Sequence, residues 1–440
     1  MAVADEETSR YRRGLSARFL ALASTFGLQV LQVPILLGVF GAEAYGNYLA
    51  LIAIPVMFTL FDGGLLGASS TRLLQLVAQG DLNEASRVSR AVVTVIMAVS
   101  GLLALAVLVV SFVVLTPLTN YDTGDPANII FFIYSLYATL NLITGVIEGA
   151  LRAAGHYPFG WLYLALMRTG EFALAAASLL VSPSLVTFVS VLLVSRLVGL
   201  VFMYRAARRR APWFDLHVTR RIGTAFHGIR TSMVGTFAQQ LSIAALLQGT
   251  VIIVSASLGP TAVVALTATR TMVNALRMVA DTIMNARMPS LTHYSARGDG
   301  SAAKAAFQRA VRHVAILMTA GAIGLLFLGQ PILRIWTHDT VGDDRALLVW
   351  YIVAVLVEVG WLCAISWPMA HNRHFVSTSI YTGATASALL AIWIVMPQPV
   401  ATVPMVQAGV MTLGLLVCLA HLRRAKIGVP TTSPVTDAVP

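Results

Sequence analysis

Runs of about twenty apolar residues follow one another along nearly the whole chain, separated by short polar or glycine-containing stretches. A run of this length crosses the hydrocarbon core of a bilayer as a helix, whereas a lone strand would leave its backbone groups unpaired in lipid. The pattern therefore predicts an all-α membrane protein with about twelve transmembrane helices. Their predicted limits are 15–40, 45–77, 89–116, 127–153, 157–181, 184–206, 228–255, 260–294, 305–328, 345–370, 375–396 and 400–423.

The second predicted helix is interrupted by the stretch "LFDGGLLGASSTR", in which Asp62 is followed by two glycines. Arg72 lies about 15 Å further along such a helix, too far to pair directly with the aspartate. Asp62 therefore either needs a partner on another helix, or water, or it caps a local break made by Gly63 and Gly64. In each case the glycine pair predicts a point at which this helix bends.

Two stretches of the first half recur in the second half. "VFGAEAYGNYLAL" has a counterpart in "SLGPTAVVALTAT", and "LVAQGDLNEASRVSRAV" has one in "HYSARGDGSAAKAAFQRAV". Gly41 then pairs with Gly259 and Gly80 with Gly298, both at an offset of 218 residues. Chance similarity between apolar segments is the alternative, but the shared offset favours a duplication. Six helices per copy would give both copies the same orientation in the membrane.

The repeat and a basic stretch near the middle of the chain predict the domain boundaries. We expect an N-terminal six-helix lobe over 1–207, a basic cytoplasmic linker over 208–223 and a C-terminal six-helix lobe over 224–426. Residues 427–440 are rich in Pro, Thr and Val, which is typical of a disordered cytoplasmic tail. Proteins with two such lobes usually hold their site between them and work by rocking one lobe against the other.

Composition supports this assignment, because 57% of the 440 residues are hydrophobic and only 11% are charged. In a soluble domain about a quarter of the residues are charged. Cys363 and Cys418 both lie in apolar segments, so no disulfide framework is expected. The first apolar run is too long for the core of a signal peptide, and we expect it to remain as a helix.

Charge predicts the orientation of the helices. If the N-terminus is cytoplasmic, the external loops contain only Arg334 and Arg345 as basic residues, together with several acidic ones. Nearly all other basic residues outside the spans then face the cytoplasm, as the positive-inside rule requires. Both termini are expected in the cytoplasm, which requires an even number of spans. Orientation explains most of the net charge of +11, so a nucleic-acid partner is not needed.

Several catalytic signatures are missing from the sequence. Neither of the two lysines follows a glycine, so there is no P-loop, and no Asp-x-Asp triplet indicates a metal-dependent glycosyltransferase. His371 and His374 are three residues apart with no third ligand in view, which favours interfacial basic residues over a metal site. We therefore expect no enzyme activity, no cofactor and no metal.

Ionisable residues within the predicted spans are the main candidates for function, since an uncompensated charge at the bilayer centre costs at least about 2.5–3.5 kcal/mol. Three pairs share a helix face: Glu148 with Arg152, Arg168 with Glu171, and Arg277 with Asp281. They are either structural ion pairs or parts of a wet cavity, and the sequence leaves both open. The charges without a local partner are Asp62, Arg72, Arg196, Arg270, Arg287 and Glu358.

The predicted interior contains more arginine than acid. A surplus of guanidinium groups suits an anion, and phosphate above all, because the planar fork of arginine matches two phosphate oxygens. An exporter of cations would instead require surplus carboxylates. The charge balance therefore favours an anionic substrate.

Several stretches resemble the Wzx-type polysaccharide flippases, which belong with the MATE exporters to the MOP superfamily. They are "FGAEAYGNYLAL", "FDGGLLGASSTRLLQLVAQGD", "TGVIEGALRAAGHYPF" and, in the second half, "GPTAVVALTATRTMVNALRMVADTIMNARMPSLTHYSARGD" and "GQPILRIW". The resemblance implies two six-helix lobes forming a V around a central cavity. It also implies transport of a polyprenyl-pyrophosphate-linked oligosaccharide from the cytoplasmic to the external leaflet of a bacterial inner membrane, for surface polysaccharide such as O-antigen, capsule or exopolysaccharide. Membrane lipid, a polysaccharide polymerase and its co-polymerase are the implied partners.

On this interpretation arginines hold the pyrophosphate, neutral amides bind sugar hydroxyls, and carboxylates couple transport to protons or sodium. The substrate-binding candidates are Arg270, Arg277, Arg168, Arg196, Arg72, Gln239, Gln240, Gln248 and Asn274, and the ion-coupling candidates are Asp62, Glu171, Asp281 and Glu358.

Two rival functions remain open from the sequence. A MATE-like ion-coupled exporter of small organic cations predicts an acidic cavity lined with aromatic residues. A membrane-embedded glycan polymerase or ligase predicts a large external loop with catalytic residues, which this sequence lacks.

Overall fold

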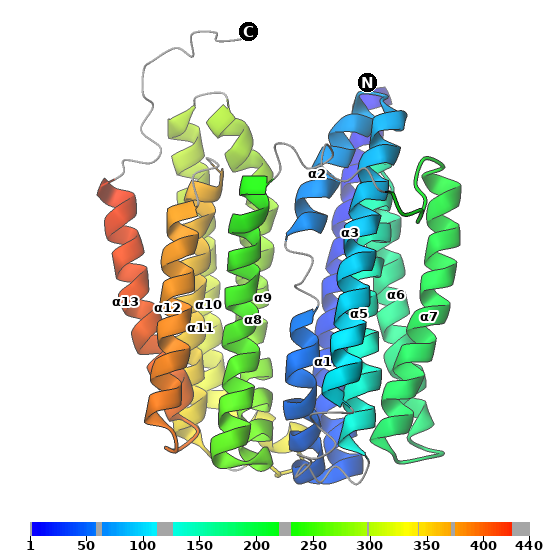
Figure 1. Cartoon of the computed structure of the whole chain (residues 1–440). Helices are drawn as coiled ribbons and strands as arrows, with labels where there is room; N and C mark the ends of the chain where they lie inside the picture. Colours follow the sequence, from blue (N-terminus) through cyan, green and yellow to red (C-terminus); the bar gives the residue numbers. More distant parts are fainter. Residues whose placement is uncertain are drawn as a thin grey trace. The chain divides into compact units, whose positions relative to one another are not determined.

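The computed structural model describes residues 2–58, 64–111, 126–219, 230–296, 299–341, 343–370 and 375–424, and these ranges contain helices and no strand. The helices follow one another as shown in Figure 1. They are α1 (Ala2–Met57), α2 (Leu65–Ala78), α3 (Leu82–Val109), α5 (Ala127–Ala153), α6 (Tyr157–Ser178), α7 (Leu185–Arg210), α8 (Arg230–Leu258), α9 (Pro260–Ala296), α10 (Gly300–Trp336), α11 (Arg345–Ala370), α12 (Phe375–Val395) and α13 (Thr402–Arg424).

Nine of the described helices are long and apolar enough to cross a membrane. The first of them is divided at Gly41, whose φ of 76° and ψ of 173° are not helical, so α1 combines two successive predicted spans. Helices α6 and α9 lie outside the nine and contain half of the interior charges discussed below. With these assignments, each predicted span has its helix, and the prediction of an all-α, multi-pass membrane protein is confirmed.

The predicted break in the second span is also present. Helix α1 ends at Met57 and α2 begins at Leu65, directly after Gly64, which has a φ of 72°. A left-handed φ suits glycine because it has no Cβ to clash with the backbone. Asp62 and Gly63 lie outside the described residues.

The internal repeat is confirmed by backbone conformation and by capping. Gly41 and Gly259 both have positive φ, at 76° and 84°. Asp81 accepts a hydrogen bond from the backbone N–H three residues later at 2.9 Å, and Asp299 does the same at 2.9 Å. Each aspartate thus satisfies a free N–H at the start of a helix, α3 in one copy and α10 in the other.

The chain packs as two compact units. One comprises Met1–Ala268 and Leu333–Gly342, and the other comprises Thr269–Ile332 and Asp343–Pro440. Helix α8 and the start of α9 therefore pack with the first copy of the repeat. The two compact units are defined by contacts within the chain, whereas the predicted lobes are defined by the internal repeat. The lobes over 1–207 and 224–426 therefore remain predictions. The predicted tail over 427–440 lies outside the described residues.

Part of the predicted linker is packed against the first unit. Phe214 is fully buried, and Arg90 on α3 donates from Nε to both carboxylate oxygens of Asp215 at 3.1 Å and from Nη2 to Oδ2 at 2.7 Å. The backbone N–H of Thr219 donates to Thr94 Oγ1 at 2.8 Å. Burial raises the pKa of Asp215, but the hydrogen bonds from Arg90 and from the His217 backbone outweigh burial and lower the pKa below its ordinary value.

The end of α10 is joined to α1 within the first unit. Trp336 donates a hydrogen bond from its indole Nε1 to the backbone carbonyl of Val30 at 2.7 Å. Pro34, four residues after Val30, has no N–H and cannot make the helical bond to this carbonyl. The indole thus supplies the donor that the proline removes.

Candidate functional site

A closed charge network lies in the first unit, where α5, α6 and α7 pack together. Arg196 on α7 donates to both carboxylate oxygens of Glu171 on α6, from Nε at 2.6 Å and from Nη2 at 2.7 Å. From α5, Asn141 accepts a bond from Nη1 and the Tyr137 hydroxyl accepts one from Nη2 at 2.8 Å. Both charged side chains are at most 2% exposed, so the network is sealed from solvent.

This network corrects the predicted partner of Glu171. The predicted pair was with Arg168, three residues earlier on the same helix. Among the contacts of the described residues, no hydrogen bond or ion pair joins these two side chains, and the carboxylate faces Arg196 instead. The candidate roles of Arg196 in substrate binding and of Glu171 in ion coupling therefore require this pair to open.

A second charge cluster lies in the other unit, on α9, α11 and α13. Arg277 Nη1 contacts Glu358 Oε2 at 2.7 Å, and Gln407 Nε2 donates to the other oxygen of the same carboxylate at 2.7 Å. The predicted contact with Asp281 is confirmed as a looser pair, with 3.8 Å between Nε and Oδ2. The Asp281 side chain is 39% exposed, so this cluster is more open than the first.

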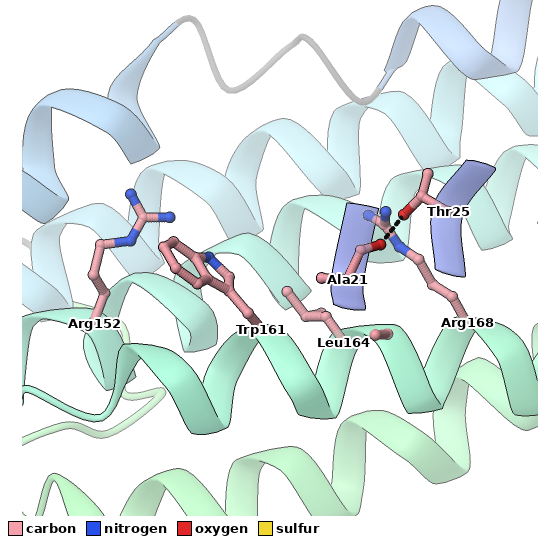
Figure 2. A pocket seen from close by; sticks show the side chains of 7 residues that line it. Ala21, Thr25, Arg152, Trp161, Leu164 and Arg168 are labelled. Carbon is pink, nitrogen blue, oxygen red and sulfur yellow. Dashed lines mark hydrogen bonds between the residues drawn. The ribbon is translucent and has the colours of Figure 1, made fainter. Parts of the chain in front are cut away.

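A pocket of about 330 Å³ lies between the N-terminal part of α1 and helix α6, within the first unit. Figure 2 shows Arg152 and Arg168 at its two ends, with Trp161 and Leu164 between them. Trp161, Leu164 and Arg168 follow one another at spacings of three and four residues on α6, which places them on one helix face. From α1, Ala21 and Thr25 complete the wall.

The two arginines of the pocket differ in their charge partners. Arg152 forms the predicted pair with Glu148, with 2.7 Å between Nη2 and Oε2. Arg168 is exposed, and within the described part of the chain its guanidinium has no hydrogen bond or ion pair. The pocket therefore has a net positive charge that is concentrated at the Arg168 end.

The remaining candidate residues are distributed over other helices. Arg72 is exposed on α2, and Arg270 and Asn274 are half-buried on α9. Asp62 lies outside the described residues. On α8 the candidate amides range from half-buried to exposed; they are Gln239, Gln240 and Gln248.

Four residues that the sequence pattern did not single out complete these sites. Tyr137 and Asn141, one turn apart on α5, hold Arg196, Gln407 holds Glu358, and Trp161 lines the pocket. The one-turn spacing on α5 was the available signal. Among the described residues, no group of three His, Cys, Asp or Glu side chains could hold a metal ion. His371 and His374 lie outside the described residues.

Comparison with known proteins identifies the fold. No protein-family profile matches the sequence, and no curated protein matches it. Among solved structures, an inward-facing multidrug resistance MATE family transporter of the MOP superfamily superposes with a TM-score of 0.78 at 12% identity, covering 93% of this chain and 96% of that chain. The lipid II flippase MurJ in an inward closed conformation gives 0.70 at 12% identity, covering 94% and 87%.

A third similar structure is a MOP superfamily transporter from Pyrococcus furiosus whose binding pocket is described as reversed in polarity. It superposes with a TM-score of 0.63 at 11% identity, covering 95% of this chain and 96% of that chain. Identities this low show a shared fold, so the chain has the fold of the MATE and MOP transporters.

Proposed function

We propose that this protein is a flippase that moves a polyprenyl-pyrophosphate-linked oligosaccharide across a bacterial inner membrane by alternating access. The substrate would pass from the cytoplasmic to the external leaflet for surface polysaccharide assembly, with both protein termini in the cytoplasm. Solved proteins of the same fold include multidrug transporters and a lipid II flippase, so the fold allows either kind of substrate. The charges of this chain favour the second kind.

The observation that supports the proposal is the state of the interior carboxylates. Each carboxylate that the structure describes within the predicted spans is paired with an arginine. A transporter of organic cations needs a carboxylate that is available to its substrate. The pairs are Glu148–Arg152, Glu171–Arg196, and both Asp281 and Glu358 with Arg277.

The arginine surplus has a physical use in a flippase. Moving one unpaired sugar hydroxyl through hydrocarbon costs several kcal/mol, so an oligosaccharide would face tens. A polar route removes most of this barrier while the lipid tail stays in the bilayer. An arginine without a carboxylate partner, such as Arg168, can bind the pyrophosphate with two hydrogen bonds.

One observation favours a second candidate, a MATE-like ion-coupled exporter of small organic cations. Asp281 is 39% exposed, and its only described ion pair is the 3.8 Å contact with Arg277. This carboxylate could accept a cation at little cost. In the flippase, the same residue would serve as an ion-coupling site.

The test is transport by purified protein in proteoliposomes. The probe is a polyprenyl-pyrophosphate disaccharide with a fluorophore on the sugar. The fraction of this probe that an external quencher reaches should change with time only when the protein is present. Ethidium efflux should not exceed that of empty liposomes. Ethidium export without movement of the labelled lipid would overturn the proposal in favour of the exporter, and Asp281→Asn should then abolish export.

A further inference from the structure

We infer that the pocket between α1 and α6 binds a sugar phosphate, with the phosphate at Arg168 and the sugar ring against Trp161. The inference rests on the proposed function, in which this pocket would recognise the phosphorylated first sugar of the lipid-linked substrate. It assigns a ligand class to a site within one compact unit.

The position of the phosphate follows from the two arginines. The charge of Arg152 is neutralised by Glu148, because its Nη2 donates hydrogen bonds to both carboxylate oxygens, at 2.9 and 2.7 Å. Within the described residues, no carboxylate forms an ion pair with Arg168 and none of its guanidinium donors makes a hydrogen bond, since Glu171 is paired with Arg196. An anion in this pocket is therefore drawn to the Arg168 end, where the guanidinium can donate two parallel bonds to phosphate oxygens.

The position of the sugar follows from Trp161. Trp161 is seven residues before Arg168 on α6, which separates their backbones by about 10 Å along the helix. The side chains of both residues line the pocket, so a phosphate at one end leaves room for a pyranose ring beside the indole (Figure 2). The flat apolar face of an indole suits the C–H face of a sugar.

Thr25 is drawn at the Arg168 end of the pocket, where the phosphate is placed (Figure 2). Its hydroxyl proton is used in a 2.9 Å bond to the Ala21 carbonyl, so the oxygen presents only acceptor lone pairs to the pocket. A ligand hydroxyl next to the phosphate can donate to it, whereas an ionised phosphate oxygen cannot. The volume of about 330 Å³ lies at the small end of ligand pockets, which fits one phosphorylated sugar and not a long oligosaccharide.

The experiment measures binding to the full chain in phosphatidylcholine nanodiscs by titration calorimetry. The probes are glucose 1-phosphate, glucose and inorganic phosphate. Wild-type protein should bind glucose 1-phosphate at least tenfold more tightly than either other probe. Arg168→Gln should weaken that binding at least tenfold, and Trp161→Leu several-fold, whereas Arg168→Lys should retain part of it.

The matched control is Arg312→Gln, which removes an exposed arginine from α10 in the other unit and should bind like wild type. Size-exclusion chromatography confirms that each variant is folded. Equal binding of glucose 1-phosphate by wild type, Arg168→Gln and Trp161→Leu would overturn the inference, whatever the flipping assay shows. Loss of binding in both variants, with no flipping by wild type, would leave the sugar-phosphate site standing while the proposed function fails.

The source of the sugar phosphate is tested by competition. The polyprenyl-pyrophosphate disaccharide, added to the nanodiscs, should displace glucose 1-phosphate. Displacement by phosphatidylinositol, and not by the disaccharide, would assign the pocket to a bilayer headgroup and overturn its role as the substrate site.

Discussion

Replacing Trp336 by Phe tests whether the indole compensates for the proline in α1. The substitution keeps an aromatic ring but removes the N–H that donates to the Val30 carbonyl at 2.7 Å. Because Pro34 offers no replacement donor, the Val30 carbonyl is then left without a hydrogen-bond donor from either α1 or α10. We expect the variant to fold and to be less stable than wild type.

The size of the effect follows from the burial of the bond. An unsatisfied buried polar group costs about 1–3 kcal/mol, and this bond is only partly buried, so we expect a loss near 1 kcal/mol. Unfolding entropy is about 2 cal/mol/K per residue, which for a chain of 440 residues converts the loss into a fall in Tm of about 1–2 °C. Thermal unfolding in detergent can be followed with a thiol-reactive dye, because Cys418 is buried and Cys363 is partly buried.

A double-mutant cycle with Pro34→Ala tests whether the indole acts through its hydrogen bond to the Val30 carbonyl. In Pro34→Ala the new backbone N–H can bond the Val30 carbonyl, so Trp336→Phe should cost little in that background. Trp393→Phe, which alters a 65% exposed indole on α12, is the control and should leave Tm unchanged. An equal loss of Tm in the wild-type and Pro34→Ala backgrounds would show that the indole acts through ring packing and not through the carbonyl.

Three further predictions concern other contacts. Arg196→Leu strands a buried carboxylate, which should cost about 3–5 kcal/mol; an unchanged Tm would show that the network is not sealed. Gly46→Ala places a Cβ onto the backbone carbonyl of Pro260 and should destabilise by about 1–3 kcal/mol in thermal unfolding. Gly27→Ala should not destabilise, because its Cβ would meet no described atom within 4 Å beyond its chain neighbours and its own helix backbone. Because the pKa of Asp215 is lowered, its stabilisation should be present above pH 3.8 and be lost as pH falls through the lowered pKa. Hydrogen exchange of residues 211–219 should show this loss in wild type, and a similar profile in Asp215→Asn would exclude the carboxylate as its cause.

The helices and the repeat could be predicted because both depend on short stretches of sequence: apolar runs in one case and matching motifs in the other. Lipid forces every apolar run of sufficient length into a helix, so counting runs was enough. Gly41 and Gly259 occupy equivalent positions of the repeat and both have a positive φ, which glycine accepts without strain. The positive φ of Gly64, directly before α2, is likewise a conformation that glycine favours.

The charge partners could not be predicted because they depend on how helices pack. Spacing suggested Arg168 for Glu171, but a carboxylate on α6 can face either its own helix or α7, and the hydrogen-bond donors and acceptors of α5 settle the choice for Arg196. A proline predicts that a carbonyl four residues earlier lacks a donor. It does not predict that Trp336, some three hundred residues later, provides one.

The two copies of the repeat have diverged at one place. Helix α9 runs unbroken from Pro260 to Ala296, while its counterpart is split into the end of α1 and α2. With the offset of 218 residues, the interruption after Met57 corresponds to the stretch around Arg277. A homodimer of half-length chains would have to accept each mutation twice. In a single chain with two copies, one copy can interrupt its helix while the other holds an ion pair, a difference that exact symmetry would forbid.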